Sequence, residues 1–232
     1  KDRTLLQEPK GLTWNGGVAL NPSRRTSLRA TYGRRFDDDN FAFDGTHELS
    51  ARTRVRANFT DSLQTTQRLI AQDLTFVGTD ADGNLIDLRT GLPFTAGTDA
   101  FGVQTETFRR RRFSTALTGT RRRNRFSLVA FWEKRKTEIT GADDTVIGVT
   151  ANLARTLSRR TTADLALAYR NSKFEGAADR TDDLYTVTGN LSYQIFRNAS
   201  AVLSYSRTQR ESDVDVNDLT ENAVVLSLRR EF

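Results

Sequence analysis

The sequence predicts an all-β fold, an antiparallel transmembrane β-barrel of the outer-membrane type, on three observations. Apolar and polar residues alternate in about eleven runs, most of them close to the ~9–11 residues that a tilted strand needs to cross a bilayer. Short basic connections alternate with longer, mostly acidic ones. The last run ends at an aromatic residue, Phe232, with Leu226 and Leu228 on the same face, as expected of a strand that closes a barrel.

The composition excludes a helical membrane protein but not a barrel. Only 37% of the residues are hydrophobic, 28% are charged, and the mean hydropathy is -0.56. No run approaches the ~20 apolar residues of a membrane helix. In a barrel only alternate residues face lipid, so the average can resemble that of a soluble protein. No apolar targeting segment follows Lys1, so we expect any signal peptide to have been removed or to lie upstream.

The expected strands follow one another as runs with apolar residues at every second position. The same-face apolar positions of these runs span residues 12–20, 28–32, 41–49, 55–59, 113–117, 126–132, 147–153, 163–169, 185–195, 201–205 and 223–232. No stretch has a sustained helical period. A single β-barrel domain over residues 1–232 accounts for all of these runs.

The connections orient the chain in the membrane. The short basic set comprises residues 21–25, 51–54, 121–124, 158–160 and 196–198, and the longer set comprises 37–40, 62–107, 137–145, 171–183 and 208–221. Bacterial barrels have short periplasmic turns, long extracellular loops and an even number of strands. The first run would then begin outside and the count is odd. We therefore expect at least one strand before Lys1, which would make this chain the C-terminal portion of a larger barrel.

Residues 64–102 interrupt the pattern of strands. Asp82-Gly83 between β-prone residues predicts a hairpin. The segment could be an extracellular hairpin, an in-folded plug or two further membrane strands, and we favour the extracellular hairpin. Residues 80–84 resemble part of a calcium loop but lack its distal Glu, so a plain hairpin turn explains them better. We expect the acidic tip formed by residues 37–39 to be solvated.

The residue types give little basis for catalysis. His47 is the only histidine and cysteine is absent, which leaves little basis for a Ser/His/Asp arrangement or a metal-binding His cluster. His47 lies near the end of a predicted strand and fits an interfacial role. A serine paired with His47 remains a weaker alternative. The sequence therefore predicts a protein that is not an enzyme and needs no cofactor or metal.

Arginines occupy the face opposite the apolar residues. They are Arg25, Arg29, Arg35, Arg54, Arg56, Arg110, Arg112, Arg125, Arg135, Arg170, Arg210 and Arg229. Lining a pore, they would favour the passage of anions. The alternative is that they pair across strands in structural ladders with the acidic residues Asp44, Glu48, Glu133, Asp164 and Glu231. Both roles can hold at once.

A basic chain also raises nucleic acid as a partner. There are 35 Lys and Arg residues against 29 Asp and Glu, and the runs 109–112 and 121–123 could contact phosphates. A sheet that binds RNA places stacking aromatics beside its arginines, whereas here the aromatics lie on the opposite face. We therefore predict no nucleic-acid partner.

Four segments carry a resemblance to a known family: residues 11–15, 21–36, 125–135 and 157–162. They resemble the outer-membrane barrel proteins associated with the PEP-CTERM/exosortase system, and the likeness extends over most of the chain. Arg230 departs from the apolar or aromatic residue common at its position, which bears on the assembly signal at Phe232. Members of that family are found with exopolysaccharide loci.

The resemblance implies a conduit in the bacterial outer membrane for export of an anionic or polysaccharide solute. The alternative is a structural or adhesive anchor without transport. Expected partners are outer-membrane lipid, lipopolysaccharide, the barrel assembly machinery, a surface polysaccharide and periplasmic export components.

Overall fold

One antiparallel sheet of eleven strands makes up most of the computed structural model, which describes residues 12–35, 38–65, 77–79, 85–87, 92–93, 107–137, 141–175 and 179–230. The strands are β1 (Trp14–Ser23), β2 (Thr26–Arg35), β3 (Asp38–Ser50), β4 (Thr53–Thr65), β8 (Thr107–Arg121), β9 (Asn124–Thr137), β10 (Asp143–Thr156), β11 (Thr161–Phe174), β12 (Arg180–Phe196), β13 (Ala199–Ser212) and β14 (Leu219–Arg230). A 3₁₀ turn, η1 (Asp215–Asn217), precedes β14. Over the described residues, each predicted run overlaps one of these strands, which confirms the all-β prediction.

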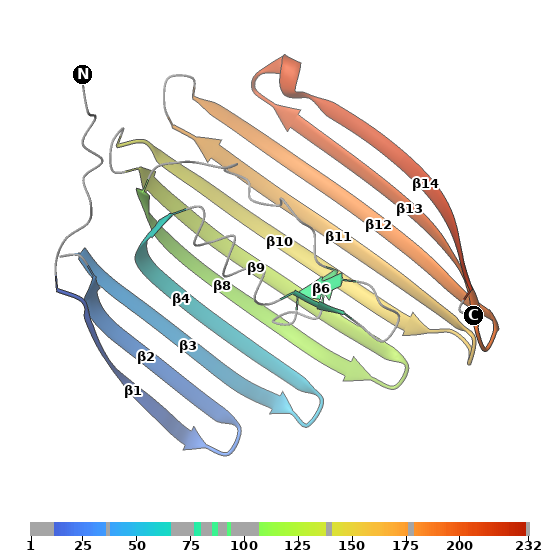
Figure 1. Ribbon diagram of the computed structural model, residues 1–232, viewed down its shortest axis with the longest axis horizontal. Helices are drawn as coiled ribbons and strands as arrows, with labels where there is room; N and C mark the ends of the chain where they lie inside the picture. Colours follow the sequence, from blue (N-terminus) through green and yellow to red (C-terminus); the bar gives the residue numbers. More distant parts are fainter. Residues whose placement is uncertain are drawn as a thin grey trace.

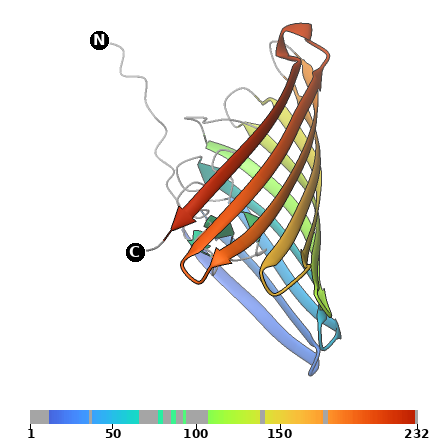
Figure 2. The ribbon, with the colours of Figure 1, turned by 90° about the vertical axis from the view of Figure 1, so that its right-hand side faces the viewer.

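The strands pair in sequence order, and β1 and β14 form the two edges of the sheet. Figures 1 and 2 show a tilted, strongly curved wall that does not close on itself. Successive hairpins give it short turns at one end, the short-turn end, and mostly longer connections at the other, the long-loop end. The β2–β3 connection at the long-loop end is an exception, because residues 38–40, predicted to belong to a longer connection, lie in β3. No helix among the described residues is long and apolar enough to cross a membrane.

Side-chain alternation gives the sheet two different faces. The apolar face carries large side chains in lateral rows, such as Phe126, Leu153 and Leu165, which are partners across β9, β10 and β11. Leu153 and Leu165 are 44% and 43% exposed. On the same face the rings of Tyr169 and Tyr185 pack 5.1 Å apart. Large apolar side chains exposed along one whole face are those of a surface that meets lipid.

The other face, the polar face, contains the buried side chains. Among the described residues only Phe108 and Val146 are buried hydrophobic side chains, and Glu133 and Arg135 are buried beside them. All four lie toward the long-loop end of β8, β9 and β10. The core of the described chain is therefore small, and much of it is ionic.

The strands extend further toward the long-loop end than predicted. Asn171 and Asp183 were assigned to a loop, but they are cross-strand partners in β11 and β12. Residues 208–212 likewise belong to β13. Polar side chains sustain the ladder there: the Tyr169 hydroxyl donates to Asp183 at 2.7 Å, and the Asn171 amide donates to the same oxygen at 2.9 Å. The periodicity of apolar residues marks only the lipid-facing part of each strand.

Residues 64–102 contribute three short strands, β5 (Val77–Thr79), β6 (Leu85–Asp87) and β7 (Leu92–Pro93), in a sheet of their own. The pairing of Val77 with Asp87 agrees with the predicted hairpin. Strands of two or three residues are far shorter than the ~9–11 that cross a bilayer. Figures 1 and 2 show this small sheet over the concave side of the wall, well below its long-loop end. The choice between a hairpin and a plug stays a prediction.

Candidate functional site

The candidate site is the row of arginines on the polar face. Of the twelve arginines predicted on this face, eleven have described side chains, namely Arg25, Arg29, Arg54, Arg56, Arg110, Arg112, Arg125, Arg135, Arg170, Arg210 and Arg229. Phe232 and the side chain of Arg35 lie outside the described residues. The role of Phe232, Leu226 and Leu228 as an assembly signal stays a prediction.

In the long-loop half, three arginines converge on the carboxylate of Glu133. The Arg110 Nη2 and Arg112 Nη1 atoms lie 2.7 and 2.5 Å from Glu133 Oε2, and Arg135 Nε lies 2.8 Å from Oε1. The side chains of Glu133 and Arg135 are each only 3% exposed. A buried carboxylate with charge-assisted bonds to both oxygens holds its partners in fixed positions.

Aromatic rings complete this buried cluster. The Arg112 guanidinium lies 4.4 Å from the centroid of the Phe131 ring, and the Arg135 guanidinium lies 4.8 Å from that of Phe108. Gly148 makes room for this packing, because a Cβ at that position would overlap the Phe131 ring. A glycine inside a strand marks such close approach. The close packing at Gly148 was not among the sequence-based expectations.

The short-turn half has exposed ion pairs instead. Arg56 Nη2 lies 2.8 Å from Asp44 Oδ2, and Arg54 Nη2 lies 2.8 Å from Glu48 Oε1, with side chains 40–58% exposed. These pairs join β3 to β4 as the ladder alternative predicted. Within the described chain, Arg29 and Arg125 are exposed and make no ion pair, although Arg29 stands opposite Asp44 in the register.

The remaining predicted arginines are engaged elsewhere. Arg210 Nε donates to the carbonyl oxygen of Asn217 in η1 at 2.5 Å. Arg170 and Arg229 each have an interaction partner. The ladder alternative is therefore seen in both halves of the polar face, whereas the pore-lining role stays a prediction.

A shallow cavity of about 250 Å³ opens at the short-turn end between the β1–β2 turn, β3 and β4. Its lining residues are Asn21, Ser23, Arg24, Arg25, Thr26, Ser27, Thr46, Glu48 and Arg54. His47 lies next to this region, with Nδ1 2.9 Å from Thr26 Oγ1. Its neighbour is a threonine hydroxyl, and no serine within the described part of the chain pairs with His47. The sequence could not indicate the cavity because three separate segments build it.

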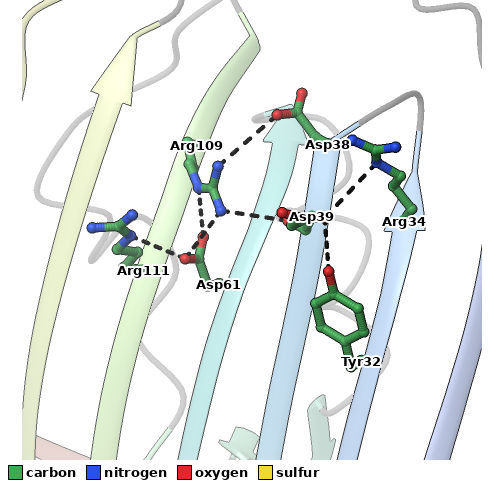
Figure 3. Close-up of polar contacts among 7 residues, drawn as sticks. All are labelled: Tyr32, Arg34, Asp38, Asp39, Asp61, Arg109 and Arg111. Carbon is green, nitrogen blue, oxygen red and sulfur yellow. Dashed lines mark hydrogen bonds and ion pairs between the residues drawn. The ribbon is translucent and has the colours of Figure 1, made fainter.

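A second charged cluster was missed because it lies on the apolar face, at the long-loop end. Figure 3 shows Asp61 between Arg109 and Arg111, whose Nε atoms lie 2.7 and 3.0 Å from its carboxylate. Asp39 accepts a 3.0 Å hydrogen bond from the Tyr32 hydroxyl and lies 3.8 Å from Arg34. Asp38, at 3.9 Å from Arg109, completes this rim cluster.

The rim cluster corrects one expectation. Asp38 and Asp39 lie in β3 and make ion pairs, so the prediction of a merely solvated acidic tip is wrong for them, while Asp37 lies outside the described residues. No group of three or more potential metal ligands occurs among the residues that the structure describes. The calcium-loop fragment, residues 80–84, falls outside that part of the chain.

Comparison with known proteins supports a porin-like barrel. Residues 132–232 match the family model described as "Putative beta-barrel porin 2". A search of curated proteins found no match.

Solved outer-membrane proteins share the fold. In vitro folded OmpT of Vibrio cholerae has a TM-score of 0.52 at 9% identity, over 93% of this chain and 63% of that one. Its loop L8 deletion mutant gives 0.53 at 10% identity, over 93% and 62%. The trimer form gives 0.53 at 10% identity, over 93% and 64%.

At such low identity, the likeness to the solved structures shows the fold alone. The chain spans slightly under two thirds of the length of the structures that it matches. The fold is that of an outer-membrane β-barrel wall, and its location is the bacterial outer membrane, as the sequence predicted.

Proposed function

We propose that this chain forms part of a non-enzymatic conduit whose polar face guides an anionic solute, such as an acidic polysaccharide, across the outer membrane. The observation that carries the proposal is the pair of exposed arginines, Arg29 and Arg125, that have no ion-pair partner in the described chain. Uncompensated guanidinium groups along a low-dielectric wall raise the local concentration of anions.

The neighbouring ion pairs leave this charge available. Asp44 and Glu48 form ion pairs with Arg56 and Arg54, and in the described chain neither forms one with Arg29. Exposed pairs of this kind bind weakly and exchange readily with solvent ions. The exopolysaccharide system is the expected setting, because the sequence resembles a family found at such loci.

A second candidate function, a structural or adhesive anchor, is favoured by a different observation. Part of the long-loop half of the polar face is buried, with Phe108 fully covered and Glu133 only 2% exposed. A barrel filled with side chains at that end would anchor its loops at the membrane surface without transporting a solute.

Planar-bilayer recordings of the natural full-length protein test the proposal. Wild-type channels should prefer anions, and the preference should weaken between 0.1 M and 1 M salt as the Debye length falls from ~10 Å to ~3 Å. Arg29→Gln combined with Arg125→Gln should reduce the preference. Arg34→Gln on the apolar face is the matched control. Protein that inserts without conducting, or that prefers cations, would replace the conduit with the anchor.

A further inference from the structure

Two neighbouring turns at the short-turn end carry an unusual concentration of arginine. The β8–β9 turn contributes Arg121, Arg122 and Arg123, and the end of β10 with the following turn contributes Arg155, Arg159 and Arg160. All six are exposed, and residues 119–125 and 154–162 contain no Asp or Glu. We call these six residues the arginine cluster.

The two turns are held together. The Thr156 amide donates to the Arg123 carbonyl at 3.0 Å, and Arg123 Nη1 donates to the Leu157 carbonyl at 3.5 Å. Arg155 is the cross-strand partner of Asn124, which in turn is paired with Arg121. Arg121 and Arg155 therefore flank Asn124 on one face, two strand spacings or roughly 10 Å apart.

The cluster lies at the border of the apolar face. Arg155 follows Leu153 at the next position on that face, and Leu153 and Leu157 are 44% and 47% exposed. Short turns of bacterial barrels face the periplasm. The arginines therefore stand where the hydrocarbon gives way to the headgroups of the periplasmic leaflet, and their aliphatic stems can follow the apolar surface.

Arg122 adds an independent observation. Its φ is +55°, and within the described chain it is the only non-glycine residue with a positive φ. Asn, Asp and Gly adopt that conformation more readily than arginine, and they are the usual choice in two-residue hairpin turns. A strained residue kept at a turn tip suggests that its side chain has a function.

The rim cluster, at the other end of the same face, differs from the arginine cluster because its arginines have carboxylate partners. There the arginines Arg34, Arg109 and Arg111 each lie within 4 Å of a carboxylate, those of Asp38, Asp39 and Asp61. In the arginine cluster, the described chain supplies no carboxylate to Arg121, Arg155 or Arg159. A surface with several guanidinium groups and no internal counterion attracts anions from its surroundings.

We propose that the arginine cluster binds the phosphate groups of anionic phospholipids in the periplasmic leaflet. Planar guanidinium groups bind phosphate through two parallel hydrogen bonds. The exposed leucines beside the cluster favour a lipid over a soluble anion, because the acyl chains cover them when the phosphate is bound. This proposal concerns a site distinct from the polar face and does not depend on conduction.

Electron spin resonance of the full-length protein in phosphatidylcholine membranes tests the site. Spin-labelled phosphatidylglycerol should associate with the protein more strongly than spin-labelled phosphatidylcholine. Because these guanidinium groups would bind the lipid phosphate, Arg121→Gln, Arg155→Gln and Arg159→Gln together should lower the association of phosphatidylglycerol to that of phosphatidylcholine. Changing the same three positions to Lys should retain part of the preference for phosphatidylglycerol. Arg34→Gln with Arg111→Gln at the other end should have little effect.

The variant Arg122→Asn distinguishes a loss of lipid binding from a loss of folding. It should relieve the turn, leave unfolding unchanged or slower, and still lower the preference for phosphatidylglycerol. Equal association of both lipids with the wild-type protein would overturn the proposal, as would a triple Gln variant that behaves like wild type. Displacement of the lipid by millimolar inorganic phosphate would identify a free-phosphate site instead. Displacement by polygalacturonate would identify a polysaccharide site.

Discussion

The two halves of the polar face both carry arginines but hold them in different environments. In the long-loop half, Arg110, Arg112 and Arg135 converge on Glu133, and two of these four side chains are almost fully buried. In the short-turn half, Arg29 and Arg125 are exposed and have no ion-pair partner in the described chain. Buried pairs depend on every member, whereas exposed charges add little to stability and stay available to ions. Position along the strand therefore decides whether an arginine joins a buried ionic cluster or stays exposed to solvent.

The largest expected effect follows from breaking the buried cluster. Glu133→Gln leaves its arginines without the carboxylate that they bind, and we expect it to lower the free energy of unfolding by about 3–5 kcal/mol. Glu48→Gln removes an exposed pair with Arg54 and should cost about 0–1 kcal/mol. Urea unfolding of the full-length protein in lipid vesicles, followed by tryptophan fluorescence, measures both. Similar losses for the two variants would remove the distinction between the halves.

A second prediction compares the two faces. Leu203 on the apolar face is 46% exposed, and its chain neighbour Ser204 lies on the polar face. Leu203→Arg places a charge in lipid and should cost about 2–4 kcal/mol if it lies near the bilayer midplane. Ser204→Arg joins a face that already carries arginines and should cost far less. The fraction of protein that folds into vesicles reports the difference. An equal loss for both would contradict the assignment of the faces.

A smaller effect is expected at the rim cluster. Asp61 is 15% exposed and binds both Arg109 and Arg111, so Asp61→Asn should cost about 1.5–3 kcal/mol. Asp39 is 56% exposed, and Asp39→Asn should cost less than about 1 kcal/mol. Thermal unfolding detected by the shift in gel mobility compares the variants. A larger loss at Asp39 would mean that its bond to Tyr32 matters more than the shared carboxylate.

The sequence predicted the wall well because the alternation of apolar residues is a property of each strand alone. All eleven strands, the two faces and four of the five short turns, those near residues 24, 51, 122 and 197, lie where the pattern placed them, and the fifth begins one residue earlier. The strand ends were less predictable. Asn171, Asp182 and Ser212 belong to strands because cross-strand polar bonds sustain the ladder beyond the apolar band, and such bonds have no period in the sequence.

The candidate site was predictable only in part. Strand parity placed Arg54, Arg56 and Arg112 on the polar face correctly. Which arginine is paired depends on register between strands, and which is buried depends on packing, so neither could be read from one strand. Predicting the Glu133 cluster would have required both the register and the packing. Gly148, opposite Phe131, was the one local signal of close packing there.

The most direct test of the account measures selectivity and stability on the same variant. For Arg29→Gln combined with Arg125→Gln, we expect the reversal potential in a salt gradient to move toward cation permeability, while the free energy of unfolding stays within about 0.5 kcal/mol of wild type. A variant that keeps the wild-type anion preference, or that loses stability in proportion to its change in selectivity, would contradict the division of the polar face into a structural half and an anion-guiding half.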